Sequence, residues 1–189
     1  MKQSVLVIHT DKESAGFEIF QTLYMNKAYT VVDEPDISPE ELRQLIVEHD
    51  IIILIGCFCQ DGLLATNPKT KGEFLLIDDT YIELLKQKIL YSIGGRRYFE
   101  KHRVSGLHIG TILTSGFEAS LYEIDAHEEE IISSGLRLIS IIGDTIQVQT
   151  PREKKEKILA DYTIAMPKPI FTSKINLRIC SLCITVRFK

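Results

Sequence analysis

The sequence predicts an α/β fold, a three-layer sandwich with a mainly parallel central sheet. Two observations lead to this prediction. Short apolar, β-branched segments alternate with helical patterns along residues 4–142. The segment at residues 51–55, Ile-Ile-Ile-Leu-Ile, is apolar at every position. A central parallel strand needs this composition because helices cover both of its faces.

The first half of the chain contains three expected strands, at residues 4–8, 29–32 and 51–55. Between the first two, residues 13–25 place aromatic and leucine side chains on one stripe, which predicts a helix. A second helix begins at Ser38. Here Ser-Pro-Glu-Glu combines a capping side chain, a proline at the first helical position and the glutamate of a capping box.

The second half continues the alternation. Asp78 or Asp79 can cap a helix that runs to Lys88, and apolar residues at 89–93 predict the fourth strand, which ends at two glycines. The remaining expected elements are a loop at 67–72, a hairpin strand at 73–77, a short helix at 99–102, a fifth strand at 107–113, a helix from 115 and another over 128–142.

The charge distribution divides the chain into an α/β domain, residues 1–146, and a basic C-terminal extension, residues 147–189. Residues 151–189 contain nine Lys/Arg and three Asp/Glu, so this segment is basic although the whole chain has a formal net charge of −4. We expect the extension to be an edge hairpin, an oligomer contact or a poorly ordered tail. It has no glycine and matches no nucleic-acid-binding module, so nucleic acid is not an expected partner.

Composition indicates a soluble, cytoplasmic protein. The longest apolar run has five residues, whereas a membrane span needs about 20, and the N-terminus lacks a signal-peptide pattern. The four cysteines, Cys57, Cys59, Cys180 and Cys183, are too few for a disulfide framework, so we expect reduced thiols. They could together bind zinc, but Cys-x-Cys is a poor zinc knuckle, so no metal or other cofactor is predicted.

Ligands of parallel sheets bind beyond the carboxyl ends of the strands. Three loops fall there: His9 to Asp11, Gly56 to Gly62 and Gly94 to Arg97. The sequence contains no Walker loop, GxGxxG fingerprint, GxSxG elbow or HExxH motif, so the common nucleotide-binding and hydrolase classes lose support.

Residues 50–64, DIIILIGCFCQDGLL, resemble the strand and loop "D-x-I-I-x-L-G-H-G-x-x-D-G-L" of small bacterial caspase-like proteins, relatives of the caspase and CHAT cysteine peptidases. Residues 76–79, residues 106–114 and Glu118-Ala119 resemble the same family, and the resemblance covers about residues 1–140. It implies a histidine after the third strand and a cysteine nucleophile after the fourth.

This chain has substitutions at both of those positions. Cys57 matches the histidine, and the position of the cysteine falls near Ile93, with a register that is uncertain from Ser92 to Gly94. The resemblance therefore implies a non-catalytic binding or regulatory domain with a protein or peptide partner.

Two further interpretations stay open. Cys57 could be a nucleophile with His9 as its base, since the first and third strands should be neighbours. Alternatively His9 is a loop residue and Cys57 a buried small hydrophobe. The other histidines, including His108, are expected to be structural or exposed.

Gly94-Gly95-Arg96-Arg97 suggests an anion- or nucleotide-sensing module. Two glycines at a strand end can turn amide groups toward an anion, and paired guanidiniums suit phosphate or carboxylate. The alternative is a turn followed by two solvated arginines. Any pocket should lie over His9, Cys57, Cys59 and Gly94 to Arg97, and a small anionic ligand is a possible occupant.

Overall fold

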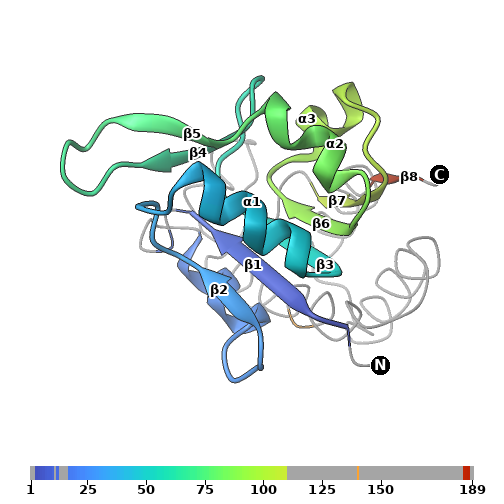
Figure 1. Ribbon diagram of the computed structural model, residues 1–189, viewed down its shortest axis with the longest axis horizontal. Helices are drawn as coiled ribbons and strands as arrows, with labels where there is room; N and C mark the ends of the chain where they lie inside the picture. Colours follow the sequence, from blue (N-terminus) through green and yellow to red (C-terminus); the bar gives the residue numbers. More distant parts are fainter. Residues whose placement is uncertain (1–2, 11, 13–16, 110–139, 141–184, 188–189) are drawn as a thin grey trace, which may run out of the picture.

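The computed structural model describes residues 3–10, 12, 17–109, 140 and 185–187. It has a mixed α/β fold built on a sheet in the order β2-β1-β3-β6-β7-β8 (Figure 1). The first five of these strands are parallel and β8 is antiparallel to β7, so the predicted α/β class with a mainly parallel sheet is confirmed. The strands are β1 (Val5–His9), β2 (Thr30–Val32), β3 (Ile51–Ile55), β6 (Ile89–Ile93), β7 (Gly106–Ile109) and β8 (Thr185–Arg187).

The centre of the sheet is its most apolar part. Every residue of β1 and β3 is buried, and these two strands pair in parallel from Val5 opposite Ile51 to His9 opposite Ile55. On one face, Leu6, Ile52 and Leu54 belong to a core that also includes residues of the helices. Burial on both faces explains why β3 tolerates no polar residue.

The predicted helix at Ser38 is confirmed as α1 (Pro39–Glu48). The Ser38 hydroxyl accepts the backbone N–H of Glu41 at 3.2 Å, and proline occupies the first helical position. Leu42 and Ile46 are buried against the sheet, and Figure 1 shows α1 lying across β1 and β3. The third layer of the expected sandwich depends on segments outside the described residues and stays a prediction.

Three other predicted helices differ from the structure. Residues 17–25 hold only a short 3-10 helix, η1 (Glu18–Leu23), which lacks a side-chain cap and contains β-branched and aromatic residues that disfavour an α-helix. Asp78 caps another 3-10 turn, η2 (Asp79–Tyr81), which continues into α2 (Ile82–Leu85) and stops before Lys88. The helix expected at 99–102 is α3 (Arg96–Lys101), which begins three residues earlier.

The predicted hairpin strand is confirmed as β5 (Glu73–Ile77). Its partner is β4 (Leu63–Thr66), a strand that the sequence analysis did not anticipate. Together they form a separate antiparallel hairpin that projects from the domain in Figure 1. The Asn67 side chain accepts the backbone N–H groups of Lys69 and Thr70 and so shapes the turn between the two strands.

Near the C-terminus, β8 pairs with β7, with Leu107 opposite Val186. This strand lies within the basic extension, residues 147–189, for which an edge hairpin is one of the expectations. The expected elements at 115 and beyond, the domain boundary at 146 and the rest of the basic extension lie outside the described residues. Among the residues that the structure describes, no helix has the length and apolarity that crossing a bilayer requires.

Candidate functional site

The three loops singled out by the sequence leave one edge of the sheet side by side. The strands β1, β3 and β6 are neighbours and end level with one another. Backbone hydrogen bonds continue beyond the strands, from Thr10 N to Ile55 O at 3.0 Å and from Gly56 N to Ile93 O at 3.4 Å. The carboxyl edge of the sheet therefore brings these loops together as expected.

Two glycines at this edge allow the loops to approach closely. Gly56 has φ +152°, and a Cβ atom there would overlap the Thr10 hydroxyl. Gly94 has φ +96°, and a Cβ atom there would overlap the backbone oxygen of Gly56. Both positions combine a backbone conformation that favours glycine with a lack of space, so the glycines have a structural reason to be there.

The loop from Gly56 to Gly62, here the β3–β4 loop, places its side chains alternately. Cys57 is exposed and Cys59 half-buried, while the ring of Phe58 packs inward against Tyr98 and Phe99 with centroid distances of 6.0 and 5.5 Å. A hydrogen bond from Cys59 N to Gly62 O at 2.9 Å closes the loop. The interpretation of Cys57 as a buried small hydrophobe is wrong, because the inward position is taken by Phe58.

His9 is the last residue of β1 and its side chain is fully buried. Its Nδ1 atom lies 3.0 Å from the Tyr24 hydroxyl, whose pKa is raised by burial and by the nearby carboxylate of Asp33. The interpretation of His9 as a loop residue is therefore wrong. His9 ends the strand next to the one that leads to Cys57, although the two side chains differ in exposure.

In the segment from Ser92 to Gly94, where the resemblance places a cysteine nucleophile, Ser92 and Ile93 are buried and Gly94 is half-buried. Ser92 is fully buried, and its hydroxyl lies 2.9 Å from Nδ1 of His108, its cross-strand partner on β7. The His108 ring stacks on Phe99 with a centroid distance of 4.8 Å. Sequence reasoning missed this Ser–His pair because the register between β6 and β7 cannot be read from composition.

In the Gly94–Arg97 segment, the two arginines have different surroundings. Arg96 is half-buried, and its Nε lies 2.9 Å from the Glu100 carboxylate one turn along α3. Arg97 is exposed. A Cβ atom at Gly95 would lie 2.8 Å from the Phe99 ring, so this glycine makes room for the aromatic cluster. The interpretation as two solvated arginines thus fits Arg97 and is wrong for Arg96.

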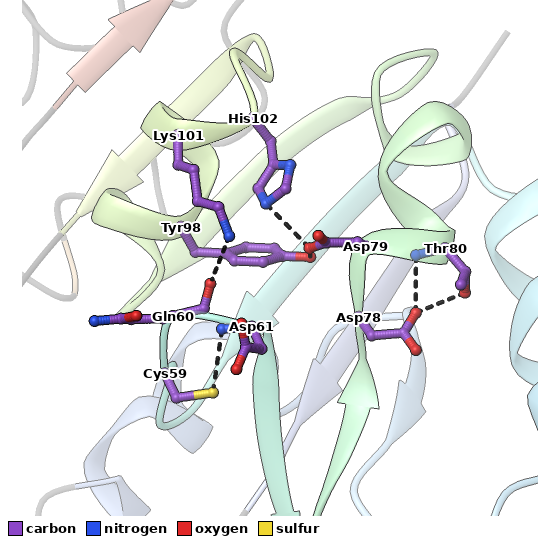
Figure 2. A network of polar contacts seen from close by, with 9 residues as sticks. All are labelled: Cys59, Gln60, Asp61, Asp78, Asp79, Thr80, Tyr98, Lys101 and His102. Carbon is purple, nitrogen blue, oxygen red and sulfur yellow. Dashed lines mark hydrogen bonds and ion pairs between the residues drawn. The ribbon is translucent and has the colours of Figure 1, made fainter.

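A hollow of about 320 Å³ lies between the β3–β4 loop and α3. It includes two of the predicted site residues, Cys59 and Arg97. Lys101 connects the two walls, since its Nζ donates to the backbone oxygen of Gln60 at 3.2 Å (Figure 2). The full lining, which we call the α3 hollow, consists of Phe58, Cys59, Gln60, Arg97, Tyr98 and Lys101.

A polar network holds α3 in place behind this hollow (Figure 2). The Tyr98 hydroxyl donates to Oδ1 of Asp79 at 3.1 Å, and Nε2 of His102 lies 3.0 Å from the same oxygen. Burial, followed by the hydrogen bond to Asp79, raises the pKa of Tyr98, so the phenol stays protonated and keeps donating at neutral pH. The side chains of Tyr98 and Asp79 thereby link α3 to η2.

Sequence reasoning missed Phe58, Gln60, Tyr98 and Lys101 as lining residues. The available signal was indirect. Arg97 and Lys101 are four residues apart and so share one side of a helix, but the expected helix at 99–102 began after Arg97.

Within residues 3–10, 12 and 17–109, no group of three His, Cys, Asp or Glu side chains is arranged to bind a metal ion. Cys180 and Cys183 lie outside the described residues, so the zinc alternative is not tested. No protein-family model matches the chain, and no curated protein matches it.

Proposed function

We propose that the chain is a non-catalytic, caspase-like binding or regulatory domain that has lost the His/Cys dyad, and that its partner binds over the loops at the carboxyl edge of the sheet. The observation that carries this proposal is that Ser92 and Ile93 are buried, while the half-buried Gly94 has no side chain. A nucleophile must reach a substrate carbonyl, and in a caspase-like domain this segment would supply it.

Each position of that segment is unsuited to the task. Ser92 has no exposed surface, and its hydroxyl is bonded to His108. Ile93 has no nucleophilic group and is 4% exposed. Gly94 has no side chain and packs on Gly56. Whichever of these three residues corresponds to the family's cysteine, that position cannot supply a nucleophile to a substrate.

The surface that remains for binding is formed by the β3–β4 loop and α3. The α3 hollow lies between them, and its walls are fixed by hydrogen bonds within and between the two elements. A preformed hollow beside the strand ends is a usual place for ligand recognition in parallel sheets. A protein or peptide partner would contact the β3–β4 loop and α3 at the rim of this hollow.

The proposal is tested by alkylation of the native full chain followed by mass spectrometry, at a series of pH values, with and without a chelator. We expect no rapid alkylation of Cys57 well below about pH 8.5, the midpoint of a free thiol. A panel of peptides should remain uncleaved. Rapid alkylation of Cys57 well below that midpoint, together with cleavage that Cys57→Ser abolishes, would show that the protein is an enzyme.

The second candidate is a cysteine hydrolase that uses Cys57 with His9 as base. The exposure of Cys57 directly after β3, next to the strand that ends in His9, favours this candidate. In this case the thiolate would attack the substrate carbonyl. His9→Gln should then slow alkylation of Cys57 at neutral pH, whereas the non-catalytic domain should show no such effect.

A further inference from the structure

We infer that the α3 hollow binds a small organic anion, with its anionic head at Arg97 and Lys101 and its apolar body against the ring of Phe58. This inference rests on the proposed binding role of the carboxyl edge and names the class of ligand. The ligand class follows from three properties of the hollow: its charge, its apolar wall and its size.

The charge comes from two cations on one side of α3. Arg97 and Lys101 are four residues apart and both line the hollow. Neither has a carboxylate within ion-pair distance in the part of the chain that the structure describes. The acidic residue of α3, Glu100, is paired with Arg96 instead. An oxyanion could therefore approach both cations without displacing an existing ion pair.

Nearby acids do not cancel this charge within the hollow. Asp79 accepts the Tyr98 hydroxyl at Oδ1, and the same oxygen lies 3.0 Å from Nε2 of His102, so this oxygen is directed toward those two side chains. Asp61 is exposed on the β3–β4 loop, where its backbone N–H donates to Cys59 Sγ. Neither acid belongs to the lining. A planar guanidinium beside an ammonium suits a carboxylate or phosphate head.

The apolar wall is aromatic and fixed. The rings of Phe58 and Tyr98 lie 6.0 Å apart, and Phe99 packs against both. Tyr98 is 2% exposed and its hydroxyl is held by Asp79, so the half-buried ring of Phe58 is the part of this wall left for a ligand. A flat apolar body would stack on such a surface, whereas a fully hydrated ion such as inorganic phosphate would gain nothing from it.

The size favours a small molecule. A volume of about 320 Å³ is at the lower end of small-molecule sites, which span roughly 300–1,000 Å³. A second hollow of about 330 Å³ near β2 has the opposite character. It is lined partly by Asp33, Glu34, Asp36 and Glu41 and would repel an anion. The two hollows therefore differ in charge, and an anionic ligand should bind only the α3 hollow.

The test is isothermal titration calorimetry of the full chain with four probes: benzoate, phenyl phosphate, inorganic phosphate and benzyl alcohol. Benzoate or phenyl phosphate should bind saturably, and the stronger of the two identifies the preferred head. Inorganic phosphate lacks the apolar body and benzyl alcohol lacks the charge. The dissociation constant of each should therefore be at least about tenfold higher than that of the better aromatic anion.

Variants locate the site. Arg97→Ala should weaken the better aromatic anion about tenfold, and Arg97→Lys should weaken it less. Lys69→Ala is the matched control, because it removes one exposed cation from outside the hollow and should leave affinity unchanged. Arg97 is exposed, so its variants should fold normally.

The absence of binding by both aromatic anions would overturn the inference, as would equal weakening by Arg97→Ala and Lys69→Ala. These results are distinguishable from a failure of the proposed function, which is read from cleavage and from Cys57 alkylation.

Discussion

Ser92 and His108 face each other across β6 and β7, with Oγ and Nδ1 2.9 Å apart and neither side chain exposed to solvent. The same distance joins nucleophile and base in many hydrolases. Here Nε2 of His108 lies 3.2 Å from the backbone oxygen of Val104, which can only accept, so Nε2 donates and, in the neutral form of the ring, Nδ1 accepts the Ser92 hydroxyl proton. The pair is a buried structural contact.

Removal of the Ser92 hydroxyl should therefore destabilise the fold. Ser92→Ala leaves Nδ1 of His108 buried without the Ser92 donor, and a loss of this kind costs about 1–3 kcal/mol in the free energy of unfolding. Urea denaturation followed by circular dichroism measures it. Ser105→Ala is the control on a half-buried serine, with an expected change within about 0.5 kcal/mol. If Ser92→Ala and Ser105→Ala lower the free energy of unfolding equally, the Ser92–His108 hydrogen bond does not contribute to stability.

The cap of α1 gives a second prediction. Ser38→Ala removes the acceptor of the Glu41 N–H and should cost about 1 kcal/mol. Ser38→Asp keeps an acceptor and places a negative charge at the N-terminus of the helix, so it should retain most of the stability. The measurement is the urea midpoint at pH 7. If aspartate destabilises as much as alanine does, the cap hydrogen bond is not the cause.

The close approach of the strand ends gives a third prediction. Gly94→Ala adds a Cβ atom that overlaps the backbone oxygen of Gly56, at a φ of +96°. Strain of this kind costs about 1–3 kcal/mol from the backbone conformation alone, and the overlap adds to it. Thermal unfolding should therefore occur at a clearly lower temperature than in the unmodified chain.

Gly72→Ala is the matched control for that change. It lies in the hairpin turn, and its nearest neighbour, the Thr70 hydroxyl, would be at an ordinary contact distance of 3.5 Å. We expect a shift of the unfolding temperature that corresponds to less than about 1 kcal/mol. If the two glycine variants unfold at the same temperature, the tight contact between Gly56 and Gly94 is not required.

The sequence predicts those elements whose signal is local. The cap at Ser38 and the all-apolar run at 51–55 specify a helix start and a central strand because each is encoded within a few consecutive residues. In the described part of the helix expected over 13–25, residues 17–25 hold only a 3-10 helix, because apolar spacing alone does not outweigh poor helix propensity. Local patterns thus decide elements more reliably than spacing does.

The candidate site was predictable only in part, for a physical reason. The carboxyl edge follows from alternation, so Cys59 and Arg97 were found. The rest of the α3 hollow depends on contacts between distant residues, such as the Lys101 side chain with the Gln60 backbone. The Ser92–His108 pair likewise depends on the strand register. Neither contact can be predicted from residues that are neighbours in the sequence.

The contact between Tyr98 and Asp79 gives a prediction about pH. Burial and the hydrogen bond to Asp79 raise the pKa of Tyr98 in the folded protein, whereas an unfolded tyrosine ionises near about 10. Above that pH the unfolded chain loses a proton that the folded chain keeps. The Tyr98 phenol therefore contributes stability that is fully present below about pH 10 and is lost as the pH rises beyond it.

Tyr98→Phe should consequently behave differently at neutral and alkaline pH. At pH 7 it loses the hydrogen bond to Asp79 and should cost about 0.5–1.5 kcal/mol in the free energy of unfolding. At pH 11 the difference in free energy of unfolding between the variant and the unmodified chain should be smaller, because phenylalanine has no proton to lose. Urea denaturation at pH 7, 10 and 11 measures this difference, and other residues that titrate in this range do so in both proteins.

Asp79→Asn tests how much the negative charge of Asp79 contributes to the raised pKa of Tyr98. The variant keeps a hydrogen-bond acceptor for the Tyr98 hydroxyl but removes the negative charge that opposes its ionisation. The alkaline loss of stability should shrink without vanishing, since burial is the larger cause. A gap between Tyr98→Phe and the unmodified chain that stays constant from pH 7 to pH 11 would mean that Tyr98 ionises as easily in the folded protein as in the unfolded chain.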